Sequence, residues 1–255
     1  SCFLDPNTYV TSHSFDAASY AAGSACAAVE RALDGEHSFA LVRPPGHHAG
    51  PDRAMGFCIF NNAAVAAAKA LESVDRVAIL DWDLHHGNGT QAIFYGSDRV
   101  LYCSVHEEGS FPKTGWVDEI GTGAGRGYTL NAPLAAGSTI ADYRLVFREV
   151  FVPALARFRP DALIVSAGQD ALADDRHGHM NLEPEDFGVL AGMLIDGTDL
   201  PLALTLEGGY GPSHGAAIAA IFSALRGERP LPADRRPPHQ NTVAVVKILK
   251  KVQFC

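Results

Sequence analysis

Short apolar runs alternate along the chain with longer segments whose apolar residues recur at helical spacing. The runs Phe39–Val42, Val77–Leu80, Val100–Val105, Ala162–Ser166 and Leu202–Leu206 predict buried strands. Strands that are buried on both faces have this uninterrupted apolar character and belong to parallel sheets. The pattern therefore predicts an α/β fold, with a parallel sheet covered by helices on both faces.

The segments between these runs predict helices at residues 15–33, 62–73, 88–95, 139–158, 184–195 and 215–225. We expect Ser14 to cap the first helix and Asp34-Gly35 to end it. Pro153 is a candidate interruption within the fourth helix, because proline cannot donate a helical hydrogen bond. No repeat or internal boundary divides the chain, so we expect a single domain over residues 1–255.

The C-terminal part has a different composition. Residues 226–239 are polar and proline-rich, and residues 242–254 form a basic amphipathic segment. We interpret residues 226–255 as a proline-rich connection followed by a tail helix docked on the body. A role at a membrane surface is the lesser alternative for that helix.

Composition narrows the class of protein further. The 255 residues are 47% hydrophobic, enough for a large core, but no apolar run is long enough to cross a bilayer. The cysteines are scattered without a Cys-x-x-Cys pair, which argues against a thiolate zinc site and favours a reducing, cytoplasmic compartment. The formal net charge of −9 argues against a nucleic-acid partner and is compatible with a cationic substrate.

Polar residues cluster where the predicted strands end. The pair His47-His48, the run from Asp81 to His86, His106, Asp170 and Tyr210 each follow the carboxyl end of a strand. In open α/β sheets, that edge is where ligands bind. We therefore expect these side chains to gather at one rim.

The run after the second strand predicts a metal site. Asp81, Asp83 and His85 alternate, so an extended backbone would point them to the same side. Two carboxylates and an imidazole converging there are costly unless a cation compensates them. Asp83, His85 and Asp170 would supply the three protein ligands usual for catalytic zinc, with Gly168 allowing the Asp170 loop to turn inward. The oxygen-rich set would also accept Fe(II), Mn(II) or Co(II).

The tandem His47-His48 offers a base for a water molecule on such a metal. Asp81 and Asn88 are candidate orienting partners, and because one is charged and one neutral they would separate the two histidine pKa values. Tyr210 could donate a hydrogen bond to a polarised carbonyl oxygen. The alternatives to these catalytic roles are that the two histidines lie in an ordinary polar loop and that the tyrosine lies in a surface turn. The glycine-rich stretch 109–127 is expected to be a long loop forming a wall of the site.

Five motifs, in order between about residue 5 and residue 225, resemble the zinc-dependent histone deacetylase / acetylpolyamine amidohydrolase family. They are Arg43-Pro-Pro-Gly-His-His-Ala, Gly56-Phe-Cys-Ile-Phe-Asn-Asn, Asp81-Trp-Asp-Leu-His-His-Gly-Asn-Gly-Thr-Gln, Ser166-Ala-Gly-Gln-Asp and Glu207-Gly-Gly-Tyr. The Pro-Pro-Gly before His-His, Asn88 and the early Asp5-x-x-Thr-Tyr9 are similar to the class II branch and its bacterial relatives. The resemblance implies an arginase/deacetylase-like fold.

The resemblance also implies residue roles. The positions of the zinc ligands are Asp83, His85 and Asp170. His48 matches the general base that later protonates the leaving amine, with Asn88 beside it. The remaining catalytic positions are His47, an electrostatic partner paired with Asp81, and Tyr210, which polarises the carbonyl.

The same family resemblance predicts a narrow acyl-lysine tunnel and monovalent cation sites. Gly56, Phe57, Gly208 and His177 match the tunnel, with the opposite wall expected between His106 and Phe111 but with no aromatic assigned to it. His177 stands where relatives carry leucine or glutamate, and whether it sets specificity or lies in a solvated loop stays open. K⁺ or Na⁺ would bind at Asp81, Asp83, His85, Ser104 and Val105, and at Phe94, Ser97, Val100 and Tyr128.

The sequence therefore predicts a metal-dependent amidohydrolase acting on acetyl-lysine peptides or acetylpolyamines and releasing acetate. The alternatives are a non-hydrolytic binder of acyl-amines and a binuclear manganese ureohydrolase, which needs further carboxylates where His86, Gly87 and Asn88 stand. Relatives usually carry an additional N-terminal segment, so we expect the chain to be a fragment, a short form or a processed product. Assembly as a homo-oligomer stays open.

Overall fold

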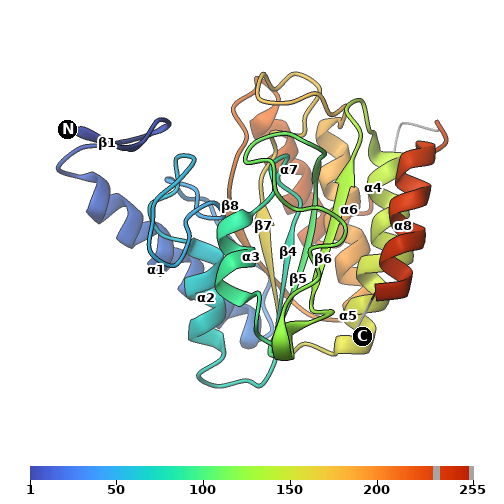
Figure 1. The fold of residues 1–255 in the computed structure, drawn as a ribbon, viewed down its shortest axis with the longest axis horizontal. Coiled ribbons are helices and arrows are strands. Elements are labelled where there is room, and N and C mark those ends of the chain that lie inside the picture. Colours follow the sequence, from blue (N-terminus) through green and yellow to red (C-terminus); the bar gives the residue numbers. More distant parts are fainter. Residues whose placement is uncertain (232–235, 253–255) are drawn as a thin grey trace.

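The computed structural model describes residues 1–231 and 236–252. Its central sheet has six parallel strands in the order β3-β8-β7-β4-β5-β6 (Figure 1). The strands are β3 (Ser38–Ala40), β4 (Val77–Asp81), β5 (Val100–Glu107), β6 (Thr129–Leu134), β7 (Ala162–Ala167) and β8 (Leu202–Leu206). The predicted α/β architecture with a parallel sheet is confirmed.

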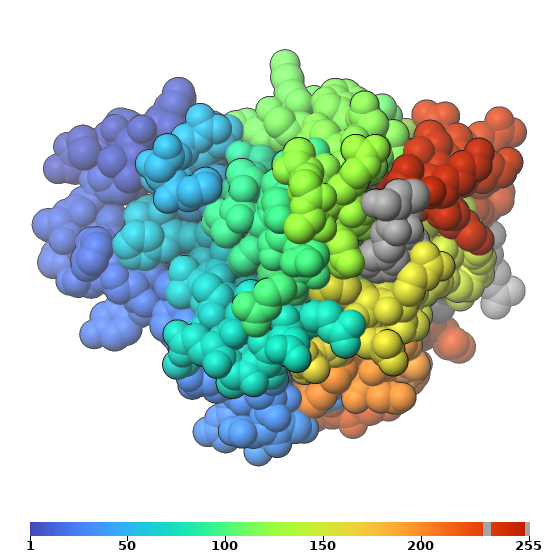
Figure 2. Space-filling model, turned by 60° about the horizontal axis from the view of Figure 1, so that its bottom comes forward, coloured from blue at the N-terminus to red at the C-terminus, as the bar shows by residue number. Residues whose placement is uncertain are grey.

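Helices cover both faces of this sheet. They are α1 (Ser14–Leu33), α2 (Asn62–Ala70), α3 (Asn88–Phe94), α4 (Ile140–Val146), the π-helix η2 (Phe147–Phe151), α5 (Val152–Phe158), α6 (Pro184–Thr198), α7 (His214–Leu225) and α8 (Gln240–Val252). Buried alanines of α1 and α2 pack on one face, and the larger apolar residues of α4 to α8 pack on the other. Helices α1 and α8 lie at opposite ends of the molecule (Figures 1 and 2).

The alternation of side chains along β4 explains the two cores. Ala78 and Leu80 belong to the larger core cluster, whereas Val77 and Ile79 belong to the cluster beneath α1 and α2. Successive strand residues point to opposite faces, so a continuous apolar run supplies both cores at once. This explains why β4 is apolar along its length until Asp81.

Two strand regions were not predicted. Strand β6 contains Asn131 and Pro133, which weaken a strand signal, but it lies at the edge of the sheet, where proline is tolerated. An antiparallel hairpin of β1 (Cys2–Asp5) and β2 (Thr8–Val10) lies outside the main sheet. Its strands have only four and three residues, too short for a periodic pattern to be visible.

One detail of the predicted helices needs correction, and the interruption predicted near Pro153 is confirmed. Ser14 is the first residue of α1 rather than its cap, because its Oγ accepts a hydrogen bond from the N–H of Thr11 at 2.9 Å in the preceding turn. The predicted helix 139–158 is divided by the π-helix η2, which ends just before Pro153. Because Pro153 has no N–H to donate to the carbonyl four residues earlier, an irregular turn is accommodated there.

The predicted tail helix is present as α8 and is docked on the body. Val246 and Leu249 are buried in the larger core, and Thr242 Oγ1 donates a hydrogen bond to Asp142 Oδ1 at 2.6 Å. Part of the predicted connection, residues 232–235, and the end of the predicted tail, residues 253–255, lie outside the described residues. Nowhere in the described part is a helix long and apolar enough to cross a membrane.

Candidate active site

Three ligand-type side chains converge beyond the ends of two adjacent strands. Asp83 and His85 follow β4, and Asp170 follows β7, which pairs with β4. One donor atom from each lies within 4.8 Å of the others. His85 Nδ1 lies 3.0 Å from Asp170 Oδ2 and 3.3 Å from Asp83 Oδ1. The structure thus brings together the three residues that the sequence predicted as metal ligands.

The donor set fits a divalent cation. Asp83 and Asp170 are each only 1% exposed, so water cannot compensate their charges. Two buried carboxylates facing each other repel unless a cation or a proton lies between them. Two carboxylate oxygens and one imidazole nitrogen are common ligands of catalytic zinc and related metals.

Two glycines make room for these carboxylates. A Cβ on Gly168 would overlap Asp83 Oδ2, and a Cβ on Gly208 would lie 2.7 Å from both Asp170 Cγ and Asp83 Oδ2. Gly208 also donates its N–H to Asp83 Oδ2 at 2.7 Å. The reason given for Gly168 from the sequence was wrong, because its φ is not positive: the position needs space rather than conformational freedom.

The histidine pair lies beside the triad on the loop after β3. His47 Nδ1 lies 3.1 Å from Asp81 Oδ2, and His48 Nδ1 lies 2.8 Å from Asn88 Oδ1. Both predicted orienting partners are therefore at hydrogen-bonding distance. The ring centroids of the two histidines are 4.0 Å apart.

The two imidazoles have opposite electrostatic environments. Burial opposes the charge on His47, but the carboxylates of Asp83 and Asp81 outweigh it and raise its pKa well above the usual value. Burial and the positive charges of His47 and His85 lower the pKa of His48 well below it. His48 is accordingly held neutral, as a base must be.

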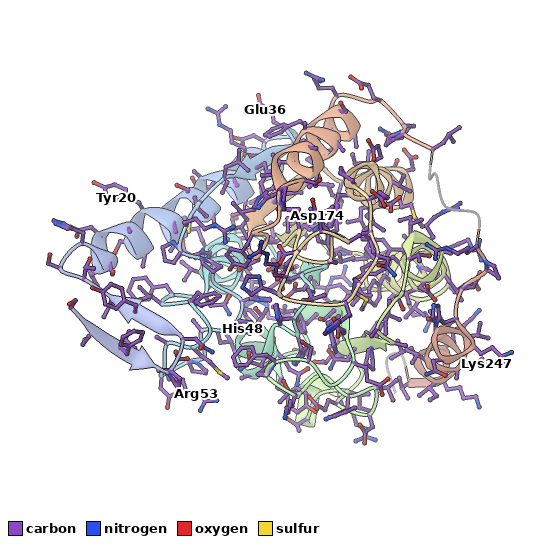
Figure 3. The ribbon with its side chains drawn as sticks, turned by 90° about the horizontal axis from the view of Figure 1, so that it is seen from above. Tyr20, Glu36, His48, Arg53, Asp174 and Lys247 are labelled. Carbon is purple, nitrogen blue, oxygen red and sulfur yellow. The ribbon has the colours of Figure 1, made fainter. Side chains whose placement is uncertain are left out.

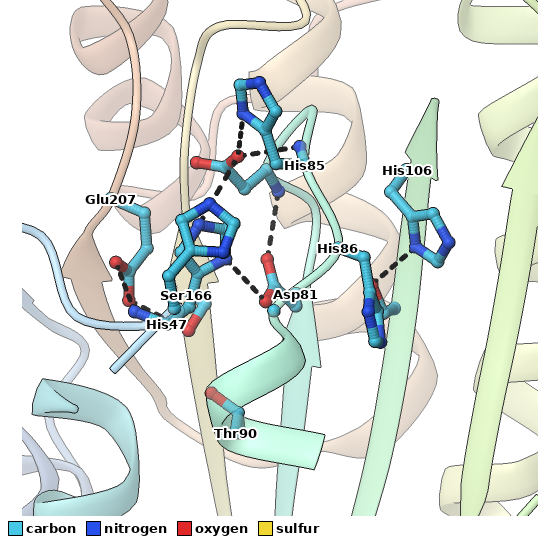
Figure 4. A network of polar contacts seen from close by, with 12 residues as sticks. His47, Asp81, His85, His86, Thr90, His106, Ser166 and Glu207 are labelled. Atoms are coloured by element: carbon cyan, nitrogen blue, oxygen red, sulfur yellow. Dashed lines mark hydrogen bonds and ion pairs between the residues drawn. The ribbon is translucent and has the colours of Figure 1, made fainter. Parts of the chain in front are cut away.

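A glutamate that the sequence analysis did not single out positions the histidine loop. Glu207 Oε2 accepts hydrogen bonds from the N–H groups of Gly46 at 2.6 Å and His47 at 3.0 Å, and Oε1 accepts one from Ser166 Oγ at 3.1 Å (Figure 4). Burial raises the pKa of Glu207 to about 7. In the sequence, Glu207 could have been identified by its place between a predicted strand and the Gly-Gly pair.

The triad and the histidines open into a cavity of about 330 Å³. Tyr210 and all four residues predicted for the tunnel, Gly56, Phe57, His177 and Gly208, line it. The wall that the sequence left without an aromatic is Phe111, whose ring lies 4.9 Å from that of His48. Seen from above, His48 lies near the middle of the molecule, whereas Tyr20, Glu36, Arg53 and Lys247 lie at its edges (Figure 3).

The β1–β2 hairpin holds one wall of this cavity. Asp5 Oδ2 accepts a hydrogen bond from the N–H of Gly56 at 2.9 Å, and Thr8 Oγ1 accepts one from that of Phe57 at 3.1 Å. Phe57 has a φ of +70°, a conformation that bulky residues rarely adopt. These bonds offset the strain and hold the ring at the mouth of the cavity.

Tyr210 is fixed by its neighbours. The Arg43 guanidinium donates to the carbonyls of Glu207 and Gly209 and lies 4.9 Å from the tyrosine ring centroid. The rings of His177 and Phe57 lie at 4.5 and 5.9 Å. Burial and the carboxylate of Asp170 raise the pKa of Tyr210, so its hydroxyl keeps its proton.

Two histidines predicted for the rim, His106 and His86, lie elsewhere. His106 is inside β5 rather than beyond it, and its ring nitrogens bond Ser104 Oγ at 2.8 Å and the carbonyl of Gly115 at 2.9 Å. His86 likewise bonds Thr114 Oγ1 at 2.8 Å. Both histidines therefore fasten the glycine-rich loop to the sheet and do not line the cavity.

The positions predicted for monovalent cations stay predictions, but their segments are adjacent. For the first site, Asp81 pairs with Ser104 across β4 and β5, and Asp83, His85 and Val105 follow on the same two segments. For the second, Ser97 donates its N–H to the carbonyl of Phe94 at 2.9 Å. The carbonyl of Tyr128 accepts from Tyr102, two residues beyond Val100.

Comparisons with known proteins agree with this geometry. Residues 1–225 match the family model described as "Histone deacetylase domain". The chain is 43% identical to the histone deacetylase-like amidohydrolase of Pseudomonas aeruginosa, over 84% of this chain and 60% of that protein. It is 41% identical to histone deacetylase 15 of Arabidopsis thaliana, over 97% of this chain and 47% of that protein.

A solved structure has the same fold. The chain superimposes on the HDA15 HD domain with a TM-score of 0.92 and 38% identity, covering 99% of this chain and 71% of that one. The chain spans about half the length of the two curated relatives described above.

Proposed function

The chain belongs to the histone deacetylase family, and on that premise we propose that it hydrolyses an N-acyl amide of a primary amine. The substrate is acetyl-lysine in a peptide or an acetylated polyamine, and the products are acetate and the free amine. The observation that carries the proposal is the convergence of Asp83, His85 and Asp170 with a neutral histidine and a tyrosine in one cavity.

Zinc is the metal we propose for the triad. A divalent ion held there would polarise the acyl carbonyl and lower the pKa of a water molecule beside it. Zinc commonly takes three protein ligands of these types and keeps one position open. The other residues of the cavity then supply proton transfer and orientation.

His48 is the base. The Asn88 amide oxygen accepts a hydrogen bond from the Nδ1–H of His48, and Asn88 Nδ2 donates to Met55 Sδ at 3.5 Å, so contacts on both sides support this orientation of the amide. Nδ1 therefore carries the ring proton, and Nε2 is the basic atom that takes a proton from the attacking water. The same Nε2–H then protonates the departing amine.

His47 and Tyr210 stabilise charge during the reaction. His47, protonated against Asp81, places a positive charge next to His48. The Tyr210 hydroxyl donates a hydrogen bond to the acyl oxygen as negative charge develops on it. One such donor contributes roughly 3 kcal/mol to lowering the barrier.

Phe57 and Phe111 favour a substrate with an unbranched aliphatic chain. Both line the cavity beside the acidic triad, and a methylene chain between aromatic rings places its terminal amide deep inside. Acetyl-lysine and acetylpolyamines both carry such an aliphatic chain, and they differ in the part of the substrate that stays outside the cavity. The substrate class is therefore decided at the rim.

The test measures acetate release from an acetyl-lysine peptide and from acetylspermidine, together with metal content. We expect turnover of at least one substrate by the metal-loaded chain. Tyr210→Phe should retain the metal and lose about two orders of magnitude in kcat. A metal-loaded chain that binds acetyl peptide without releasing acetate would instead be a non-hydrolytic binder, and full activity of Tyr210→Phe would remove the hydroxyl from the mechanism.

A further inference from the structure

A carboxylate outside the triad lies buried at the rim of the cavity. Asp175 is on the loop between β7 and α6, and its side chain is completely buried. Its neighbours Asp174, Arg176 and His177 are exposed. A buried carboxylate needs hydrogen-bond donors to replace its lost hydration.

Two donors come from the segment that carries Tyr210. Asp175 Oδ2 accepts from the N–H of Tyr210 at 2.6 Å and from the N–H of Gly211 at 2.9 Å. These bonds join the β7–α6 loop to the β8–α7 loop. Hydrogen bonds between backbone N–H groups and an ionised carboxylate are shorter and stronger than neutral ones.

The other oxygen of Asp175 holds His177. Oδ1 lies 2.9 Å from the backbone N–H of His177 and 2.8 Å from its Nδ1. An ionised carboxylate only accepts, so Nδ1 carries the ring proton. The imidazole then lies against the Tyr210 ring, with centroids 4.5 Å apart.

The peptide bond before Tyr210 is held from its opposite end as well. The carbonyl of Gly209 accepts hydrogen bonds from Arg43 at 2.9 Å and from His214 Nδ1. Gly209 has a φ of +119°, which an L-residue rarely adopts. The Gly209–Tyr210 peptide is thus fixed at its oxygen by Arg43 and His214 and at its nitrogen by Asp175.

We propose that Asp175 is a positioning residue that holds the Tyr210 hydroxyl in its catalytic position, through the tyrosine backbone and through the His177 ring that lies against the tyrosine ring. The inference rests on the proposed function, because it assigns the effect to the tyrosine that polarises the acyl carbonyl. Asp175 itself does not line the cavity and touches no substrate. Its effect should therefore appear in kcat rather than in KM.

A carboxylate is required at this position, and an amide is not equivalent. All four groups facing Asp175 donate hydrogen bonds, two to each oxygen. In Asp175→Asn, one oxygen becomes an NH₂ group that faces two donors. One side must move away, and a displacement of about 1 Å at a catalytic group costs on the order of 100-fold in rate.

The experiment compares Asp175→Asn with wild type, using acetyl-lysine peptide and acetylspermidine. We expect kcat to fall about 10- to 100-fold with KM and metal content nearly unchanged. In a Tyr210→Phe background the same change should have little further effect, because the hydroxyl that Asp175 positions is gone. Equal losses in both backgrounds, or wild-type kcat in Asp175→Asn, would overturn the proposal.

Asp161→Asn is the matched control. Asp161 Oδ2 also accepts hydrogen bonds from two backbone N–H groups, those of Asp75 and Arg76, but at the opposite edge of the sheet. Because both donors face a single oxygen there, an asparagine can keep both bonds through its amide oxygen, and Asp161→Asn should leave kcat unchanged. If Asp175→Asn does not fold, Asp175→Glu keeps both oxygens and displaces them by one methylene. A folded Asp175→Glu with wild-type kcat would overturn the proposal, whereas inactive wild type would refute the proposed function instead.

Discussion

Gly208→Ala tests whether the space around the triad controls metal binding. The new Cβ would overlap Asp170 Oδ2 and lie 2.7 Å from Asp83 Oδ2, whereas ordinary contacts begin at 3.4 Å. The backbone of Gly208 is not in the left-handed region, so alanine adds no conformational strain there. The substitution therefore acts chiefly through its close contacts with the two carboxylates.

The size of the effect follows from the distances. The Asp83 carboxylate must withdraw by about 0.7 Å, the difference between 3.4 and 2.7 Å, and Asp170 Oδ2, which the new Cβ would overlap, must withdraw further. Metal sites tolerate deviations of only about 0.2 Å from ideal ligand distances. Loss of a supporting contact around a metal ligand typically weakens binding 10- to 100-fold, about 1.4 to 2.8 kcal/mol. Displacement of the ligands themselves should reach at least the upper end of that range.

The assay is competition for Zn²⁺ between the chain and a chromophoric chelator, with metal-dependent thermal stabilisation as a second readout. Gly215→Ala is the control, because a Cβ at that position in α7 has no atom within 4 Å. Gly208→Ala should bind zinc at least about 100-fold more weakly, and Gly215→Ala should bind it as wild type does. Unchanged zinc affinity in Gly208→Ala would refute the assignment of Asp83 and Asp170 as ligands.

Three further substitutions test the ligand set and the fold. Asp170→Ala removes one of the three donors and should leave the purified chain without stoichiometric metal, as measured by elemental analysis; full occupancy would exclude Asp170 as a ligand. Gly23→Ala, in the middle of α1 with open space around its Cβ, should stabilise the fold by about 0.5–1 kcal/mol in urea unfolding, and no gain would contradict a helical Gly23. Thr242→Val removes the buried hydrogen bond to Asp142 and should cost about 1.5–3 kcal/mol, and an unchanged midpoint would show that α8 does not depend on this bond.

The elements that the sequence predicted are those with a strong local signal. Strands β4, β5, β7 and β8 are continuous apolar runs, so their burial is encoded in each segment separately. Strand β6 and the β1–β2 hairpin lack that signal, because β6 carries Pro133 and the hairpin strands are short. Strand β6 forms against β5, and the hairpin is bonded to Gly56 and Phe57, and a local pattern contains neither of these contacts.

Which residues of the site could be identified from the sequence depended on their chemical type. Asp83, His85 and Asp170 are chemically conspicuous at strand ends, and the structure places them together. Phe111 was not identified, since an aromatic residue in a glycine-rich loop has no periodicity to place it. Asp175 was missed because its neighbours on the loop are equally polar, and only its burial against the N–H of Tyr210 distinguishes it.

The order of the strands explains why these particular segments share one site. Strands β8, β7 and β4 are adjacent and parallel, so the segments after them, carrying Gly208, Asp170 and Asp83, emerge side by side. A charged side chain would be costly to bury among the apolar side chains inside these strands. The carboxylates therefore lie at the carboxyl ends of the strands. Once there, each carboxylate is held by backbone N–H groups of a neighbouring segment, as Asp83 is by Gly208 and Asp175 by Tyr210. The acidic groups of the site thus connect its loops through hydrogen bonds. We therefore expect a substitution at any of these carboxylates to change metal affinity or the position of Tyr210 more than it changes the stability of the fold.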